Sequence, residues 1–151
     1  MIKEGQKAPS FNLPDQNGED TSLSDFLGKK VVLWFFPKAS TPGWTTEGQG
    51  FRDELEHFNN KDISIIGMSA DSVQKQKNFC DKQNFSYPIL ADETKETLKA
   101  YGAWGVKKMY GREYEGIIRC SFLINEEGII EKVYDKVKTK SHAKDILSDI
   151  G

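Results

Sequence analysis

The stretch that decides the fold is residues 31–53, "VVLWFFPKASTPGWTTEGQGFRD". Its first part, Val31–Phe36, is a continuous apolar run of β-branched and aromatic side chains, which is typical of a strand buried on both faces. A helix is predicted from Thr45 to Asn59, because apolar residues such as Phe51 and Phe58 recur there at helical spacing. The stretch therefore predicts a buried strand, a short loop and an amphipathic helix in succession.

The rest of the chain continues this alternation of strands and helices. Strands are predicted at Ile63–Ala70 and 87–92, helices at 71–85, 93–102 and 141–148, and a hairpin over 116–136 that turns at 126–128. Asp71 with Gln74 predicts a capping box, and Gly102 a helix end. The order predicts one α/β domain over residues 1–151, with a parallel sheet covered on both faces and closed by an antiparallel hairpin.

Composition excludes several classes of function. With 21 basic and 23 acidic residues, the chain shows no charge bias toward nucleic acid or an anionic membrane. It has neither an apolar run of about 18–20 residues nor an N-terminal signal core, so we expect a soluble cytoplasmic protein. Two cysteines are too few for a secreted disulfide scaffold. His57 and His142 have no partner at metal-ligand spacing, so we assign them no role and predict no metal.

The loop after the first strand is suited to bind an anion. In open α/β sheets, sites lie beyond the carboxyl ends of the strands, which is where this loop begins. Pro37 and Pro42 restrict its backbone, and Thr41 supplies a hydroxyl just ahead of the helix. Position 44 falls in the first helical turn, where unpaired N–H groups would lower the pKa of a cysteine from about 8.5. The sequence has Trp44 there, and an ordinary capped turn with an aromatic lid is the alternative interpretation.

Two motifs carry a resemblance to a known family. Pro37-Lys-Ala-Ser-Thr41-Pro-Gly-Trp44 matches the peroxiredoxin signature Pro-x-x-x-Thr/Ser-x-x-Cys at every defined position except the last. "TPGWTTEGQGFRD" resembles the bacterioferritin-comigratory-protein (PrxQ) subgroup. "YGAWGVKKMYGREYEGIIRCSFLIN" resembles that subgroup's segment with a catalytic arginine, here Arg119. The similarity extends over essentially the whole chain.

The resemblance implies a fold and an activity. Peroxiredoxins have a thioredoxin-like fold, a central mixed sheet flanked by helices, and they reduce hydrogen peroxide or organic hydroperoxides without a cofactor. A peroxidatic thiolate becomes a sulfenic acid, a resolving cysteine forms a disulfide with it, and thioredoxin reduces that disulfide. Members of this subgroup are often monomeric. The resemblance thus predicts an antioxidant peroxidase acting on peroxide and a dithiol reductant.

Site residues follow by position. The resemblance implies that Thr41 hydrogen-bonds the peroxide, that Pro37 shields the pocket, and that Arg119 stabilises the thiolate and the developing charge. Glu47, one turn beyond position 44, would support the arginine. Taken alone, Arg119 could equally be a surface ion-pair residue.

The cysteines raise a second question. Gln49 occupies the position where many members of the subgroup have the resolving cysteine. Cys80, 36 residues after position 44, resembles the resolving cysteine of other peroxiredoxins, although it could also be a buried apolar cysteine beside Phe79. Cys120 is predicted to pack in the core.

Trp44 stands at the peroxidatic position, so the chain as written should not turn over peroxide. Three accounts are open: a cysteine or selenocysteine replaced by engineering or decoding, a natural pseudoenzyme with a binding or scaffold role, or a different enzyme in the same pocket. Because an indole overpacks a site shaped for a thiol, we also expect residues from Thr41 to Gly48 to be displaced or unwound, with Trp44 turned outward.

Overall fold

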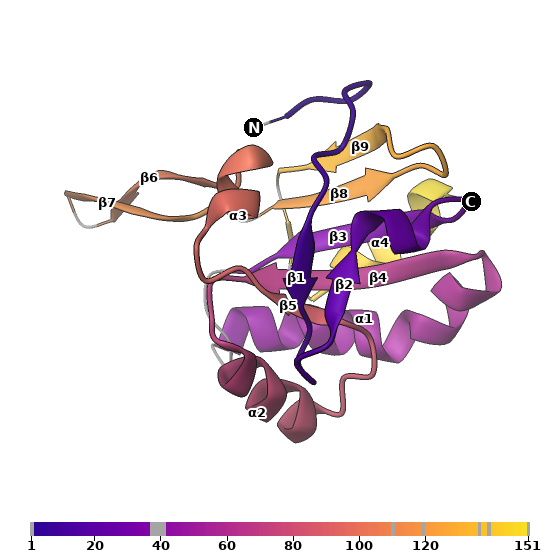
Figure 1. The fold of residues 1–151 in the computed structure, drawn as a ribbon, viewed down its shortest axis with the longest axis horizontal. Helices are drawn as coiled ribbons and strands as arrows, with labels where there is room; N and C mark the ends of the chain where they lie inside the picture. Colours follow the sequence, from indigo (N-terminus) through magenta and orange to yellow (C-terminus); the bar gives the residue numbers. More distant parts are fainter. Residues whose placement is uncertain are drawn as a thin grey trace.

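The fold is built around two successive strand–helix units (Figure 1). The computed structural model describes residues 2–36, 42–109, 111–118, 120–135, 137–138 and 140–150, without the side chains of residues 42–44, 107–109 and 114. In chain order its elements are β1 (Asn12–Pro14), β2 (Asp20–Ser22), the 3-10 helix η1 (Leu23–Phe26), β3 (Lys30–Phe35), α1 (Pro42–Asn60), β4 (Ile63–Ser69), α2 (Val73–Gln83), β5 (Ile89–Ala91), α3 (Glu96–Ala100), β6 (Trp104–Met109), β7 (Arg112–Ile117), β8 (Cys120–Ile124), β9 (Ile130–Tyr134) and α4 (His142–Ile150).

The central sheet has the strand order β5-β4-β3-β8-β9. Strands β3, β4 and β5 run parallel, whereas β8 lies antiparallel to β3 and β9 antiparallel to β8. Leu33 on β3 is aligned with Ile66 on β4 and with Phe122 on β8, so β3 is bonded on both sides. This mixed sheet confirms the predicted parallel core closed by an antiparallel hairpin.

Alternation along β3 separates two hydrophobic layers. Val32 and Trp34 face the layer that includes residues of α1, α2 and α4, whereas Val31 and Leu33 face the layer formed with the N-terminal segment and α3. The side chains of all four are at most 1% exposed, which explains why this segment is a continuous apolar run. The predicted strand–helix order therefore encloses the sheet on both faces.

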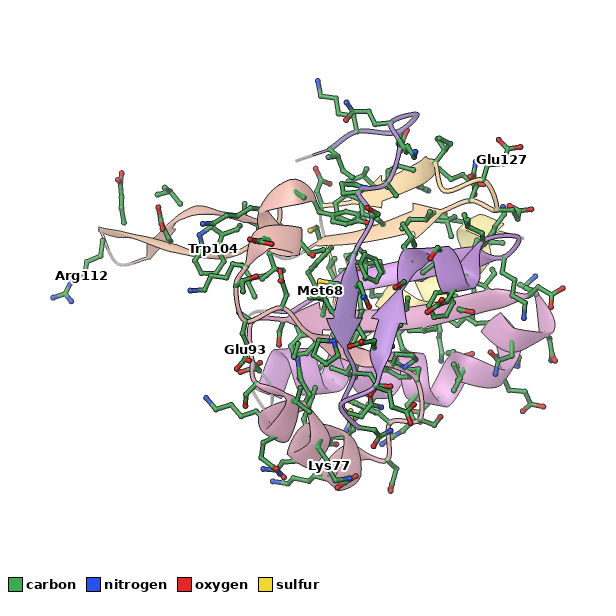
Figure 2. The ribbon with its side chains drawn as sticks, viewed as in Figure 1. Met68, Lys77, Glu93, Trp104, Arg112 and Glu127 are labelled. Atoms are coloured by element: carbon green, nitrogen blue, oxygen red, sulfur yellow. The ribbon has the colours of Figure 1, made fainter. Side chains whose placement is uncertain are left out.

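Two antiparallel pairs were not predicted from the sequence. β1 and β2 are only three residues long, and the β6–β7 hairpin projects away from the sheet, with Arg112 near its far end (Figures 1 and 2). Val106 in this hairpin is 62% exposed. The outer part of this hairpin lies outside the core, so it does not need the apolar alternation by which strands are found in a sequence.

Two sequence-based expectations are wrong in detail. The cap of α2 is Ser72, whose hydroxyl accepts from the Lys75 N–H, whereas the Asp71 carboxylate accepts from Ser69 Oγ. Helix α1 is also continuous from Pro42, which contradicts unwinding over residues 42–48; Thr41 and the Trp44 side chain lie outside the described residues. Glu47, in the second turn of this continuous helix, has a buried side chain.

No helix in the described ranges is long and apolar enough to cross a membrane.

Candidate functional site

The predicted site is centred on the start of α1, just beyond the carboxyl end of β3. Pro37, Thr41 and Arg119 lie outside the described residues, and so does the side chain of Trp44. The backbone of position 44 lies in the first turn of α1, as predicted. Glu47 is the one predicted catalytic residue whose side chain is described. The roles of the other four stay predictions.

Glu47 enters a buried polar cluster formed by three elements. Its side chain is 1% exposed, and its Oε1 lies 3.8 Å from Nε2 of His142, the first residue of α4. The same Nε2 atom lies 2.8 Å from Oγ of Ser121 on β8. His142 is 3% exposed and Ser121 is fully buried. The cluster joins the helix that carries position 44 to β8 and to the C-terminal helix.

His142 is a neutral imidazole near pH 7. Burial lowers its pKa from 6.5 to about 4, and the nearby Asp145 carboxylate acts in the opposite direction. The His142 ring makes edge-to-face contacts with the rings of Phe51 and Tyr134, with centroid distances of 5.7 and 5.5 Å. A hydroxyl beside an imidazole could suggest a nucleophile and base, but Ser121 is inaccessible to any substrate. The geometry instead fits a structural role.

His142 and Ser121 were missed by the sequence analysis. The available signal was a polar residue, Ser121, inside the otherwise apolar run Cys120–Ile124. A buried hydroxyl in a central strand requires a hydrogen-bond partner, and His142 near the C-terminus supplies it. His57, by contrast, is exposed and lies beside Glu54 on the outer side of α1.

A second contact connects α1 to the segment after α2. The hydroxyl of Tyr87 donates a 2.9 Å hydrogen bond to the carbonyl of Gly48. The ring of Phe85 lies so close to the helix that a Cβ on Gly48 would be 2.6 Å from its Cζ atom. Position 48 therefore requires glycine, because the Phe85 ring leaves no room for a side chain there.

Cys80 lies on α2 close to this contact. Its side chain is 3% exposed, and burial raises the pKa of its thiol to about 12, with Asp81 and Asp15 adding to the effect and Lys77 opposing it. Burial also raises the pKa of Tyr87, and the negative forms of Cys80 and Glu47 contribute. Tyr87 therefore lies within electrostatic reach of both groups. In this conformation the Cys80 thiol is protonated and unreactive.

Cys120 lies in the other hydrophobic layer, among residues such as Phe35 and Phe122. It is 1% exposed, and burial raises the pKa of its thiol to about 12. The packing role predicted for Cys120 is thus confirmed. Within the described part of the chain, His, Cys, Asp and Glu side chains form no group that could hold a metal ion.

Comparison with known proteins identifies the class. The AhpC/TSA family matches residues 4–133. The chain belongs to this family, whose peroxiredoxins are thiol-dependent peroxidases with a thioredoxin-like fold. It is 44% identical to the protein named Peroxiredoxin Bcp of Bacillus subtilis (strain 168) over 149 residues, which cover 99% of this chain and 95% of the relative.

Two solved structures of Xanthomonas campestris Peroxiredoxin Q are also similar. Each superimposes with a TM-score of 0.88 and covers 93% of this chain and 89% of its own, at 37% and 36% identity. In each variant one cysteine is replaced by serine, and the two replaced cysteines lie 36 positions apart. The predicted PrxQ relationship is confirmed, while the assignment of Trp44 to the peroxidatic position stays a prediction.

Proposed function

We propose that this chain has the architecture of a PrxQ-type thiol peroxidase with its nucleophile position at residue 44, and that it is inactive as long as tryptophan occupies that position. The observation that supports it most strongly is the place of residue 44 in the first turn of α1, directly after the carboxyl end of β3. Unpaired N–H groups at such a turn stabilise an anion. An indole has no thiol to ionise, so peroxide has no attacking atom.

With a cysteine at position 44, the proposed reaction proceeds through a sulfenic acid. The thiolate sulfur attacks one peroxide oxygen, the O–O bond breaks, and the other oxygen leaves as water or an alcohol after it takes up a proton. Arg119 and Thr41 would stabilise the charge that develops on the oxygens, and Pro37 would shield the pocket. Glu47 would hold the arginine in place from its buried position.

Cys80 is the proposed resolving residue. It follows position 44 by 36 residues, the same spacing as between the two cysteines replaced in the Xanthomonas protein. The Cys80 sulfur would attack the sulfenic sulfur, water would leave, and a disulfide would form. A dithiol protein of the thioredoxin type would then reduce the disulfide. We further propose that the reaction takes place in the cytoplasm on a single-domain monomer.

The test is to restore the thiol. Trp44→Cys should reduce hydrogen peroxide in the presence of thioredoxin, thioredoxin reductase and NADPH, whereas the chain as written should not. Trp44→Ser is the matched control, because it removes the indole without adding a thiol. A Trp44→Cys protein that is folded by circular dichroism and still inactive would overturn the proposal.

The pseudoenzyme alternative is favoured by Trp44 itself. A binding or scaffold protein would not need the arginine, so Arg119→Met should leave its cellular role unchanged. The codon for residue 44 separates the accounts of the tryptophan. A UGA codon would indicate selenocysteine, whereas UGG in the natural gene would support the pseudoenzyme.

A further inference from the structure

Helices α1 and α2 are joined by hydrogen bonds that converge on one residue. Nε2 of Gln49 donates to Oε1 of Gln83 at 2.8 Å, and Nη1 of Arg52 donates to the backbone carbonyl of Gln83, also at 2.8 Å. Both bonds are partly buried, where hydrogen bonds are less exposed to competing water. We call Gln49, Arg52 and Gln83 the α1–α2 clasp.

The clasp holds the turn of α2 that contains Cys80. Gln83 is the last residue of α2, and the helix ends with Asn84 in the left-handed conformation at φ 59°. The N–H groups of Asn84 and Phe85 both donate to the carbonyl of Cys80. Cys80 and Gln83 therefore belong to one cooperative unit, the C-terminal turn of α2, and cannot be released separately.

Reaction at the Cys80 sulfur requires this turn to open. The side chain is 3% exposed, in the same hydrophobic cluster as Phe79 and Phe85. Lys77, three residues earlier on α2, points into solvent (Figure 2), whereas the Cys80 side chain packs into this cluster. Because local opening is governed by the contacts that hold a segment, the bonds to Gln83 set how often the thiol becomes accessible.

The partners of Gln83 come from the helix that carries position 44. Gln49 lies five residues and Arg52 eight residues beyond position 44. Gly48, immediately before Gln49, accepts the Tyr87 hydrogen bond. A movement of these turns of α1 would break the bonds to Gln83. The clasp therefore makes the state of the turn around Cys80 depend on the state of α1.

We propose that Gln49 and Arg52 are positioning residues for Cys80: through Gln83 they keep the last turn of α2 closed, and they release it when this part of α1 moves. The inference that this release serves the resolving step rests on the proposed function. The inference that the clasp controls the accessibility of Cys80 does not depend on the proposed function. It can therefore be tested on the chain as it exists, with Trp44 in place.

The experiment measures alkylation of the two cysteines in the native protein. Iodoacetamide reacts with a thiolate to form a thioether with loss of iodide, and peptide mass mapping over time gives separate rates for Cys80 and Cys120. Cys120 lies in the opposite hydrophobic layer and reports unfolding of the whole domain. The test variants are Gln49→Ala, Gln83→Ala and Arg52→Met. The control is Gln74→Ala, which removes an exposed amide bond to Asn78 on the same helix as Cys80.

Each clasp variant should speed alkylation of Cys80 by about two- to tenfold relative to Gln74→Ala, because that is the effect of one net hydrogen bond on an opening equilibrium. Cys120 should not change. The Gln49→Ala/Gln83→Ala double variant should alkylate little faster than either single variant, since both remove the same bond. Arg52→Lys, which keeps a donor, should restore slow alkylation relative to Arg52→Met.

Two results would overturn the clasp: Cys80 rates equal to that of Gln74→Ala in all three variants, or equal acceleration of Cys80 and Cys120, which would indicate global unfolding alone. The proposed function fails separately, through a folded but inactive Trp44→Cys protein. In an active Trp44→Cys protein, Gln49→Ala should also speed disulfide formation in a single turnover.

Discussion

The hydroxyl of Tyr87 donates a 2.9 Å hydrogen bond to the carbonyl oxygen of Gly48. Tyr87 is 3% exposed and stacks on Phe85, with ring centroids 5.4 Å apart. The early turns of α1 thus rest on a pair of aromatic rings that immediately follows α2. This contact supports the helix at Gly48, within the part of α1 that is continuous from Pro42 and therefore not unwound.

Substitution of Gly48 should test this packing. In Gly48→Ala, the new Cβ would lie 2.6 Å from Cζ of Phe85, so the ring must move, and overpacking of this kind costs about 1–3 kcal/mol of unfolding free energy. Gly50→Ala is the matched control on the same helix, because its Cβ would lie an ordinary 3.7 Å from that of Ala143. Since alanine favours helices, Gly50→Ala should stabilise by up to about 1 kcal/mol. Urea unfolding at pH 7 measures both, and equal shifts for the two variants would contradict the interpretation.

The buried imidazole of His142 should make stability depend on pH. Its pKa is lowered from 6.5 to about 4, so in this interval the unfolded chain binds a proton that the folded chain does not. Stability from this group is therefore fully present above about pH 6.5 and is lost as the pH falls toward 4. At the acid end the loss is about 3 kcal/mol.

The measurement is urea unfolding between pH 7 and pH 4 for three proteins. His142→Gln keeps a donor for Ser121 but cannot titrate, so its stability should fall less steeply with decreasing pH than that of the unmodified chain. His57→Gln replaces an exposed histidine and controls for the loss of an imidazole at the surface. Parallel curves for all three would show that His142 does not titrate as its burial requires.

Restoring the nucleophile should reveal the electrostatics of the site. In Trp44→Cys we expect a thiol pKa below the ordinary value of about 8.5, because the helix terminus favours the thiolate and the proposed function gives Arg119 the same effect. In this background, Arg119→Met should raise that pKa and slow peroxide reduction by about a hundredfold. The rate of iodoacetamide alkylation against pH gives the pKa without peroxide. If Arg119→Met left both quantities unchanged, Arg119 would be an ordinary surface residue.

The sheet could be predicted because its strands are apolar on both faces. Val31–Phe36 was recognisable for this reason, and the order of strands and helices then implied the parallel core. The β6–β7 hairpin has no such pattern, because residues such as Val106, which is 62% exposed, lie outside the core. A residue that fits a local sequence rule can be bonded elsewhere in the fold. Asp71 precedes α2 as a capping residue would, but its carboxylate accepts a hydrogen bond from Ser69. Ser72 caps the helix instead.

The candidate site was predictable only where a motif is local. Glu47 was named by its place after position 44; its side chain is buried, and its support of the arginine stays a prediction. His142 and Ser121 are 21 residues apart, and only the antiparallel strands and the packing of α4 bring them together. The clasp residue Gln83 was invisible for the same reason, since its partner Gln49 is 34 residues away. Contacts of this kind require the fold before they can be inferred.

The last prediction concerns the product of oxidation. Peroxide treatment of Trp44→Cys should give a disulfide between positions 44 and 80, detectable by mass mapping after the remaining thiols are alkylated. Cys120→Ala should not change this product, because Cys120 is buried in the opposite layer. Trp44→Cys/Cys80→Ser should instead accumulate sulfinic acid at position 44, since no second thiol is available to resolve the sulfenic acid.

The disulfide also tests the structure, because the Cys80 thiol as described is buried and protonated. A disulfide can form only if the last turn of α2 opens on the timescale of turnover. Rapid disulfide formation therefore requires opening of this turn, which the Gln49–Gln83 hydrogen bond resists. The alkylation rates and the disulfide-formation rates should agree: variants in which Cys80 is alkylated faster should also form the disulfide faster. If over-oxidised sulfur at position 44 accumulated while Cys80 stayed fully alkylatable, Cys80 would be a packing residue, and another thiol, on a partner or a small molecule, would have to resolve the sulfenic acid.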